Sequence, residues 1–350
     1  MPALLARAGW KLDVVSLSQI YKLSKHVHHL HLVEHVHELE DAALDIVEKH
    51  GQYDWVIPAS DELLGELRKR ASVDRRFLKL LPIAGPEGRS HLFSKLNLSR
   101  VLSRHGLPTP AWAEVSSIAM AIKQAQVLGF PCFAKRDRSY GGLGTFRCEH
   151  PASLEEIANQ FAGEPFLLQQ GLIGKLWAIE ALYWQAQLQA FSASLCLSTT
   201  HPYGPSLKRC YGQSPPGLGP LLQRLGEALC AHGWANITII QSDDHQLHCI
   251  EADLRPTIWL ALDEHLGGDF AKVIKNLGNQ DGTNHVQCYS GQSGDHRSII
   301  HPQRLIQAGA SDVEIRESLA LLPEEEPLFM EELCREKFFA LVPTSPTVPH

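Results

Sequence analysis

A lysine that ends an apolar run is followed closely by three glycines. Lys135 closes the run PCFAK, and the loop after it contains Gly141, Gly142 and Gly144. Glycine lets backbone N–H groups come close to an anion, and the lysine adds a positive point charge. The segment therefore suits phosphate groups, although neither G-x-x-x-x-G-K-[ST] nor G-x-G-x-x-G is present. The alternative is an ordinary glycine-rich turn between two strands.

A second segment, IEADLRP at 250–256, alternates apolar and charged residues. In a strand, side chains two positions apart share a face, so Glu251, Asp253 and Arg255 are expected to point the same way. Two neighbouring carboxylates suit a Mg2+ ion held jointly with phosphates. An adjacent arginine suits the negative charge that develops in phosphoryl or acyl transfer. The alternative is a solvated charged face on an edge strand.

The elements that must position these residues follow from hydrophobic periodicity and from turn residues. The opening ALLARAGWKLDVVSL predicts a helix that runs into a strand, and alternating helices and strands follow, which favours βαβ units and a parallel sheet. No strand precedes the first helix, so we expect a shortened N-terminal unit. The runs LWAIEALYWQ and LQAFSASLCLS predict an antiparallel pair with one face buried, and ANITIIQS with QLHCIEADLRP predicts a second hairpin.

The boundaries of the remaining elements are set by glycine, proline and capping residues. The expected helices cover 41–50, 61–70, 90–105, 117–128, 153–161, 219–232, 313–319 and 327–338, and the expected strands cover 29–33, 54–59, 131–136, 145–149 and 165–169.

Composition narrows the class of protein. The chain has 350 residues, of which 44% are hydrophobic and 20% charged, so it is globular and long enough for two or three domains. A net charge of −7 disfavours a general nucleic-acid-binding surface. No apolar run is long enough to span a membrane, and Arg7 and Lys11 interrupt any signal region. Eight cysteines without a C-x-x-C pair favour reduced, buried thiols in a cytoplasmic protein, with a catalytic cysteine as the alternative.

Three weaker signals have simple interpretations. Tyr203, Lys208 and Arg209 follow a strand end, where a solvated loop is the main expectation and a substrate contact the alternative. Trp177 and Trp184 lie on strand runs and are expected in the core. A histidine-rich stretch most simply forms a surface strand with its loops, because its ligands do not obviously converge, while Zn2+ binding is the alternative. Its members are His26, His28, His29, His31, His35 and His37.

Taken together and in this order, the segments resemble the ATP-grasp superfamily over roughly residues 1–275. Lys95, in HLFSKLNLSRVLSRHGLPTP, matches the family's first nucleotide lysine, and Lys135 matches the second, which contacts phosphate. Residues 141–144 match the glycine loop that folds over the phosphates. The segment LLQQGL matches the hinge that contacts adenine. The resemblance therefore implies ATP binding by Lys95, Lys135, Gly141, Gly142, Gly144, Gln169, Gln170 and Leu172.

The resemblance also assigns roles to the acidic segment. Glu251, Asp253 and Arg255 match the family's E-x-N-x-R, which implies Mg2+ binding by the two acids and catalysis by Arg255 together with Lys135. Two positions depart from the family pattern. Thr238 stands where the preceding strand usually provides a Mg2+ ligand, and Leu176 stands where a polar residue is usual after the hinge.

The implied fold combines α/β and α+β parts. It has a Rossmann-like α/β N-terminal domain at 1–88 and an ATP-grasp domain at 89–275, which contains a small mobile lid at 108–168 and a larger α+β part. A C-terminal helical tail at 276–350 follows. The implied enzyme is an ATP-dependent carboxylate–amine ligase that forms an acyl phosphate from a small, amino-acid-like substrate. Its partners are a small-molecule carboxylate and an amine, without nucleic acid or membrane, and a homodimer is compatible.

Two alternatives to this ligase remain open. One is an ATP-binding module that has lost catalysis, which the residues at 176 and 238 favour. The other is a bicarbonate-using enzyme of the biotin carboxylase or carbamoyl-phosphate synthetase kind.

Overall fold

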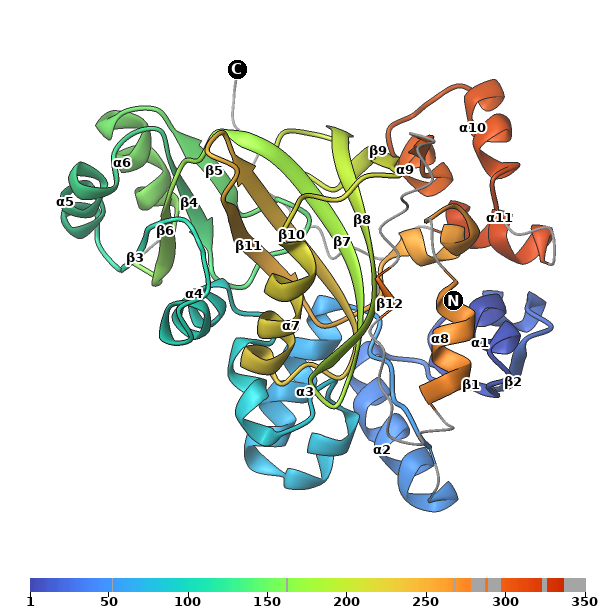
Figure 1. Cartoon of the computed structure of the whole chain (residues 1–350). Helices are drawn as coiled ribbons and strands as arrows, with labels where there is room; N and C mark the ends of the chain where they lie inside the picture. Colours follow the sequence, from blue (N-terminus) through green and yellow to red (C-terminus); the bar gives the residue numbers. More distant parts are fainter. Residues whose placement is uncertain are drawn as a thin grey trace.

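The computed structural model describes residues 1–51, 53–161, 163–266, 269–277, 287–288, 297–322 and 326–336. Figure 1 shows a large twisted sheet at the centre, a small sheet with its helices at one side, and the N-terminal and C-terminal elements at the other. The N-terminal part contains α1 (Pro2–Arg7), β1 (Leu12–Ser16), η1 (Gln19–Leu23), β2 (Val27–Leu32), η2 (Val36–Glu38), α2 (Leu39–His50), α3 (Asp61–Val73), η3 (Arg75–Leu80) and η4 (Pro86–His91).

The N-terminal sheet is smaller than expected. β1 and β2 pair in parallel, but the expected strand at 54–59 is wrong, because this segment forms no ladder within the described residues. Trp55 instead packs against the rings of Trp10, Trp184 and Trp234, with centroids 6.0, 5.9 and 6.4 Å away. Pro58 also lacks the N–H that a ladder needs. The segment is thus held by aromatic packing rather than by strand pairing.

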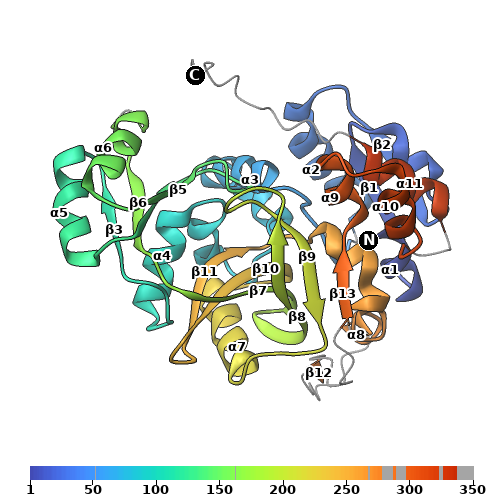
Figure 2. The ribbon, with the colours of Figure 1, turned by 90° about the horizontal axis from the view of Figure 1, so that it is seen from above.

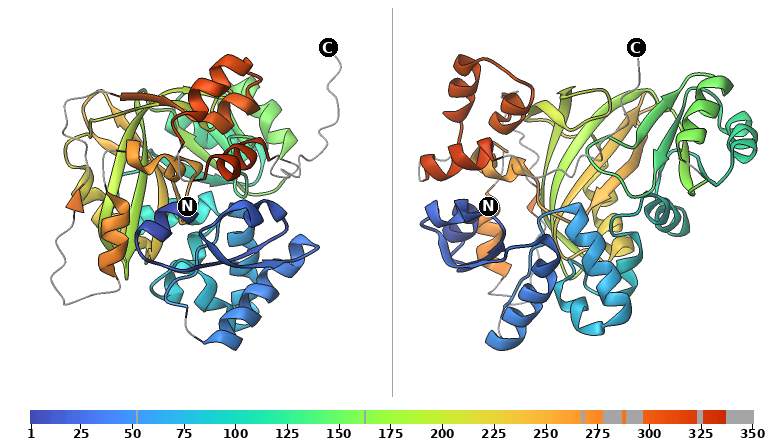
Figure 3. Two further views of the ribbon diagram at one scale, coloured as in Figure 1. Left: turned by 90° about the vertical axis from the view of Figure 1, so that its right-hand side faces the viewer. Right: turned by 180° about the vertical axis from the view of Figure 1, so that it is seen from behind.

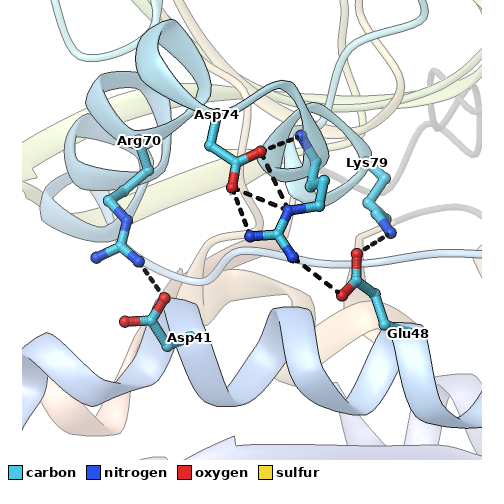
Figure 4. Close-up of polar contacts among 6 residues, drawn as sticks. Asp41, Glu48, Arg70, Asp74 and Lys79 are labelled. Atoms are coloured by element: carbon cyan, nitrogen blue, oxygen red, sulfur yellow. Dashed lines mark hydrogen bonds and ion pairs between the residues drawn. The ribbon is translucent and has the colours of Figure 1, made fainter.

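Exposed ion pairs connect α2, α3 and η3, as Figure 4 shows. Glu48 on α2 lies 3.0 Å from Lys79 and 3.5 Å from Arg76, and Asp41 pairs with Arg70. Exposed pairs of this kind contribute little to stability, because water screens them. Burial of apolar side chains is the stronger force here, and it comes from residues such as Leu44, Leu67, Ala71, Phe77 and Leu80.

The helix expected at 90–105 begins later than predicted. Phe93 has a φ of 53°, which lies outside the right-handed helical region and separates η4 from α4 (Lys95–Arg104). Ser94 then caps α4, since its side chain accepts a hydrogen bond from the N–H of Asn97 at 3.2 Å. As a result, Lys95 is the first residue of the helix rather than a residue in its second turn.

The small sheet has a core of its own. It consists of β3 (Trp112–Val115), β4 (Cys132–Arg136), β5 (Thr145–Cys148) and β6 (Phe166–Gln170) in the order β3-β6-β4-β5, with all pairs antiparallel. Helices α5 (Ile118–Leu128) and α6 (Pro151–Gln160) pack on it. Every residue of this core lies between positions 113 and 168. We call this part the small unit.

The large sheet runs in the order β11-β10-β7-β8-β9-β13, with β12 added beside β8. Its strands are β7 (Gly174–Trp184), β8 (Gln187–Thr199), β9 (Ser206–Tyr211), β10 (Gly233–Ser242), β11 (Leu247–Asp253), β12 (Gln287–Cys288) and β13 (Arg297–Ile300). Both hairpins expected from the sequence are present and antiparallel. The expectation of one buried face is wrong for β7, because every residue from 177 to 183 is buried.

The two faces of the large sheet are covered by different elements. On one face, α7 (Leu218–Leu229) packs its leucines against Ile179 and Ile237. On the other face, η5 (Ile258–His265) and α8 (Phe270–Leu277) contribute to a core that includes Leu182 and Trp234. Beyond this apolar end, the same face of the sheet turns polar, and there it carries the residues of the candidate site.

The C-terminal segment, expected to be a helical tail, also extends the large sheet. β13 pairs with β9, and Figure 2 shows the two strands side by side. Helices α9 (Pro302–Gln307), α10 (Asp312–Leu319) and α11 (Pro327–Arg335) follow. Figure 3 shows them beside the N-terminal elements, where Phe329 meets Tyr21 and Ser24 donates to Glu326 at 2.7 Å. Residues 337–338 of the expected last helix lie outside the described residues.

Two further expectations concern cysteines and membranes. The seven cysteines whose side chains the structure describes are free thiols, and five of them are buried. Within those ranges, no helix combines the length and the apolar character that crossing a bilayer requires.

The separate core of the small unit leads to a stability prediction. Leu154 on α6 and Leu225 on α7 are both fully buried, but in different cores. Replacing a buried leucine by alanine costs about 2–5 kcal/mol. Under limited proteolysis, Leu154→Ala should bring the first cuts into residues 108–168, while Leu225→Ala should leave that region resistant. The same order of cleavage sites in both variants would contradict a self-contained small unit.

Candidate active site

The acidic segment lies on β11, and its partner β10 orders it. Glu251 stands opposite Thr238, and Asp253 stands opposite Asn236. A register shift beside Thr238 leaves Ile250 as the extra residue of a β-bulge. After the bulge, residues 252 and 254 point into the core, so the two acids point to the other face, as the alternation predicts.

Arg255 binds acids from two parts of the chain. Its Nε and Nη2 donate to the two carboxylate oxygens of Asp61 at 2.6 and 2.7 Å, and Nη2 also lies 3.4 Å from Asp253. Asp61 is the first residue of α3, which Ser60 caps. This bidentate pair therefore connects the end of β11 to the N-terminal part of the chain. Sequence reasoning missed Asp61, because 194 positions separate it from Arg255.

The electrostatics of the acids favour a bound cation. Burial, together with the negative charges of Asp61 and Glu251, raises the pKa of Asp253 well above its usual range. Although burial works against the charged form of Arg255, Asp253 and Asp61 outweigh it and raise the pKa of that guanidinium. Carboxylate oxygens are the ligands that Mg2+ prefers, and a divalent cation between the acids would relieve their repulsion.

Lys135 approaches these acids from the small unit. It lies on β4, is 9% exposed, and donates from Nζ to Oε1 of Gln169 on β6 at 2.8 Å. Burial lowers its pKa to about 8; Glu251 acts against this shift, and Lys95 adds to it. Lys135 thus lies within electrostatic reach of the first acid and of the other lysine. The structure brings together three residues that the sequence places about 40 and 116 positions apart.

Lys95 holds the start of the glycine loop. Its Nζ donates to the carbonyl oxygen of Ser139 and lies 3.2 Å from the hydroxyl of the same residue. The carboxylate of Asp137 accepts from the N–H of Leu96 and the hydroxyl of Ser94, both at 2.9 Å. The N-terminus of α4 and the loop are therefore joined by several hydrogen bonds, and a phosphate in this region would meet the same donors.

The glycine loop requires its glycines. Gly141 and Gly142 have φ angles of 61° and 79°, in the left-handed region that other residues rarely adopt. A Cβ atom on Gly142 would collide with the carbonyl of Tyr203, and one on Gly144 would collide with the side chain of Ser139. The loop backbone therefore lies directly against the connection between β8 and β9, and no side chain stands between them.

The hinge segment lies at the end of β6. Gln169 is buried and holds Lys135, while Gln170 is half-buried and donates its N–H to Ala111 at 2.8 Å. Leu172, just after the strand, is half-buried. Leu176, one of the two residues that depart from the family pattern, lies on β7 opposite Ile240, and β10 separates it from the acids on β11. The nucleotide roles of these residues stay predictions.

A buried polar group next to the acids was not anticipated. Arg209 was expected in a solvated loop, but it lies on β9, is buried, and donates from Nη1 to Glu180 at 2.7 Å. Thr257 donates to the same carboxylate oxygen at 3.1 Å. The guanidinium also lies 4.3 Å from the centre of the Trp259 ring. The alternation of β9 was too short to reveal that residue 209 faces inward.

Arg304 adds a second guanidinium from α9, which is half-buried. Burial, together with the positive charges of Arg209 and Arg255, lowers its pKa to about 10. Its Nη1 donates to Gln307 at 2.7 Å, whereas its Nε is buried without a hydrogen-bond partner in the described part of the chain. The second oxygen of Glu180 is likewise buried and unpartnered there. Such atoms need a ligand or water, since leaving them unsatisfied is costly.

Comparisons with sequences give limited information. No protein-family model matches the chain. Among curated proteins, N5-carboxyaminoimidazole ribonucleotide synthase of Synechococcus elongatus is 30% identical over 86 residues, which are 24% of this chain and 22% of that protein. The chain therefore matches only about a fifth of that relative.

Comparisons with solved structures extend over most of the chain. N5-carboxyaminoimidazole synthetase of Staphylococcus aureus is similar with a TM-score of 0.65 at 14% identity, over 90% of this chain and 82% of that one. The biotin carboxylase domain of Hydrogenobacter thermophilus 2-oxoglutarate carboxylase, in complex with MgADP, ADP and bicarbonate, gives 0.60 at 15%, over 81% and 68%. L-amino acid ligase of Bacillus licheniformis gives 0.58 at 19%, over 85% and 75%. These likenesses confirm the architecture expected from the sequence, and the chain therefore has the ATP-grasp fold.

Proposed function

We propose that this protein is an ATP-dependent ligase that activates a small-molecule carboxylate as an acyl phosphate and joins it to an amine. The observation that carries the proposal is that Lys135 of the small unit lies within electrostatic reach of Glu251 on the large sheet. A lysine, two neighbouring acids and an arginine at one place are what phosphoryl transfer from ATP to a carboxylate needs. ATP-grasp neighbours include an amino acid ligase and carboxylating enzymes, which agrees with this class.

The residues have distinct roles in the proposed reaction. Lys95, Lys135 and the loop at 141–144 bind the phosphates, and the segment with Gln169, Gln170 and Leu172 binds the adenine. Glu251 and Asp253 hold Mg2+, which neutralises phosphate charge when bound. Arg255 stabilises the charge that develops on the transferring group, while Asp61 keeps it oriented.

The carboxylate substrate belongs on the polar face beyond Arg255. Arg304 provides positive charge there, because its Nε has no hydrogen-bond partner in the described part of the chain and its guanidinium lies within electrostatic reach of Arg255. The substrate carboxylate would attack the γ-phosphorus of ATP, release ADP, and form an acyl phosphate. The amine would then displace phosphate from the acyl carbon. Small-molecule substrates of this kind need neither nucleic acid nor membrane as partner.

The domain organisation is part of the proposal. The lid that covers the nucleotide is the segment 108–168, which contains nearly all of the small unit, and its closure excludes water. The limits 1–88, 89–275 and 276–350 are proposed with it, although the last segment also provides Arg304 to the site and β13 to the sheet. A cytoplasmic location and a homodimer are compatible with this function.

A second candidate is an enzyme that activates bicarbonate. It is favoured by the similarity to the biotin carboxylase domain solved with bicarbonate and by the 86-residue match to a carboxyaminoimidazole ribonucleotide synthase. Bicarbonate carries a carboxylate-like group, so the same residues would serve both reactions. A non-catalytic ATP-binding module is the remaining alternative, favoured by Leu176 and by Thr238, which stands where the family pattern has an acidic or amide Mg2+ ligand.

Removal of the Lys135 ammonium should weaken ATP binding. Lys135→Ala should cost about 1–3 kcal/mol of binding free energy in calorimetry, because a charged contact to phosphate is lost. The control Lys123→Ala, at an exposed position of the same unit, should bind normally. The pKa of about 8 adds a pH test, since the ammonium form predominates below that value and is lost above it. ATP affinity should therefore fall as the pH rises through 8, and it should not do so in Lys135→Ala.

Removal of the Glu251 charge should affect turnover more than binding. Glu251→Gln keeps the shape of the side chain but weakens the hold on the cation, and kcat should fall by about 10²–10³ while nucleotide affinity changes little. Asp243→Asn, in the exposed turn of the same hairpin, is the control. A near-normal kcat in Glu251→Gln would show that this carboxylate is only a surface charge.

An ADP-release screen of carboxylates crossed with amines, with bicarbonate as a separate arm, tests the reaction itself. With ATP and a productive carboxylate but no amine, hydroxylamine should trap the acyl phosphate as a hydroxamate. ADP release that requires bicarbonate instead would favour the second candidate. ADP release with both substrates but without any hydroxamate would reject the acyl phosphate.

A further inference from the structure

A group of possible metal ligands lies in the N-terminal sheet, outside the candidate active site. Asp13 is on β1, and His28 and His29 are neighbours on β2. One ligand atom from each residue lies within 4.8 Å of the other two. No second group of three His, Cys, Asp or Glu residues comes this close in the described ranges. Figures 1 and 2 show β1 and β2 far from the small unit, so this group is distinct from the ATP-binding region.

A β-bulge explains why two consecutive histidines reach the same carboxylate. Successive side chains of a regular strand point to opposite faces. In the β1–β2 ladder, Leu12 pairs with Val27 but Asp13 pairs with His29, so His28 is an extra residue. A bulge of this kind redirects side chains locally. The Nδ1 atoms of His28 and His29 accordingly lie 3.3 and 3.2 Å from the same oxygen, Oδ1 of Asp13.

These spacings fit a small dication. A tetrahedral site with metal–ligand bonds of about 2.0–2.1 Å places its ligand atoms about 3.3 Å apart. The imidazole rings are half-exposed, at 49% and 60%, so an ion can enter from solvent and keep water in its remaining positions. Asp13 is only 17% exposed. The orientation of its carboxylate is fixed, because the hydroxyl of Tyr53 donates to its second oxygen, Oδ2, at 2.6 Å. A second group that orients a ligating carboxylate is typical of metal sites.

We propose that Asp13, His28 and His29 form a binding site for a divalent transition-metal ion, with Zn2+ as the expected occupant. Two imidazole nitrogens and one carboxylate are ligands that Zn2+ accepts readily, whereas Mg2+ and Ca2+ prefer oxygen. The ion would bridge β1 and β2. A two-stranded sheet gains little stability from its own ladder, so such a link should stabilise the N-terminal unit.

The test is a Zn2+ titration of the tag-free, metal-free full chain by calorimetry, with excess Mg2+ present to fill oxygen sites. Wild type should bind one Zn2+ and unfold at a higher temperature with it. His28→Gln combined with His29→Gln should weaken binding more than tenfold, and Tyr53→Phe should weaken it by about tenfold. The matched control is His35→Gln combined with His37→Gln, a second histidine pair whose rings stack 5.4 Å apart. This control should bind as wild type does.

X-ray absorption of Zn2+-loaded wild type provides a second measurement that needs no variant, and it should show two imidazole ligands. Unchanged Zn2+ affinity in the His28–His29 variant, or a Zn2+ environment without imidazole, would overturn the proposal. It would identify the three residues as a hydrogen-bonded group only. None of these results depends on ligase activity, so the site and the proposed function can fail separately.

Discussion

Charge that is removed from water has to be compensated inside the protein, and this requirement governs the polar face of the large sheet. Arg255 is compensated by Asp61, and Arg209 by Glu180. Among the described residues of this face, compensation is incomplete at a negative place and at a positive one. One is the pair of acids on β11, and the other is Arg304. A metal–nucleotide and an anionic substrate, as proposed, would complete both.

The pair of Arg255 and Asp61 also has an architectural effect. It joins the strand that carries the acids to the first turn of α3, so the N-terminal part of the chain contributes directly to the site. A guanidinium with two carboxylate partners keeps its orientation before any substrate arrives. In the proposed reaction, Arg255 would therefore share its donors between Asp61 and the substrate.

Much of the fold could be predicted from local patterns. The alternation along 251–255 predicts the correct face for both acids. The extra residue of the bulge, Ile250, comes before them and leaves their own alternation unchanged. The two hairpins could also be predicted, because alternation and turn residues are local patterns. The resemblance carried by Lys95, Lys135, the glycine loop and the acidic segment led to the ATP-grasp fold, which the solved structures confirm. The roles of individual site residues stay predictions.

What could not be predicted depends on contacts between distant segments. Asp61 and Arg304 have no local pattern that marks them, since each meets the site only through tertiary packing. The histidine-rich stretch was ambiguous because the bulge at His28 depends on the register with β1, and Asp13 lies outside the stretch. The segment around Trp55 has the composition of a strand, but aromatic packing decides its place.

The core that includes Leu182 and Trp234 affects how the chain folds during synthesis. Leu4 of α1 shares this core with Phe270 of α8 and Phe329 of α11. A nascent chain emerges from the ribosome with its N-terminus first, so this core cannot close until nearly the whole chain has been synthesised. The apolar core of the small unit forms entirely within residues 113–168 and can close much earlier. The apolar face of α1 therefore lacks its partners on α8 and α11 until those helices have been synthesised, and until then it stays exposed to other apolar surfaces.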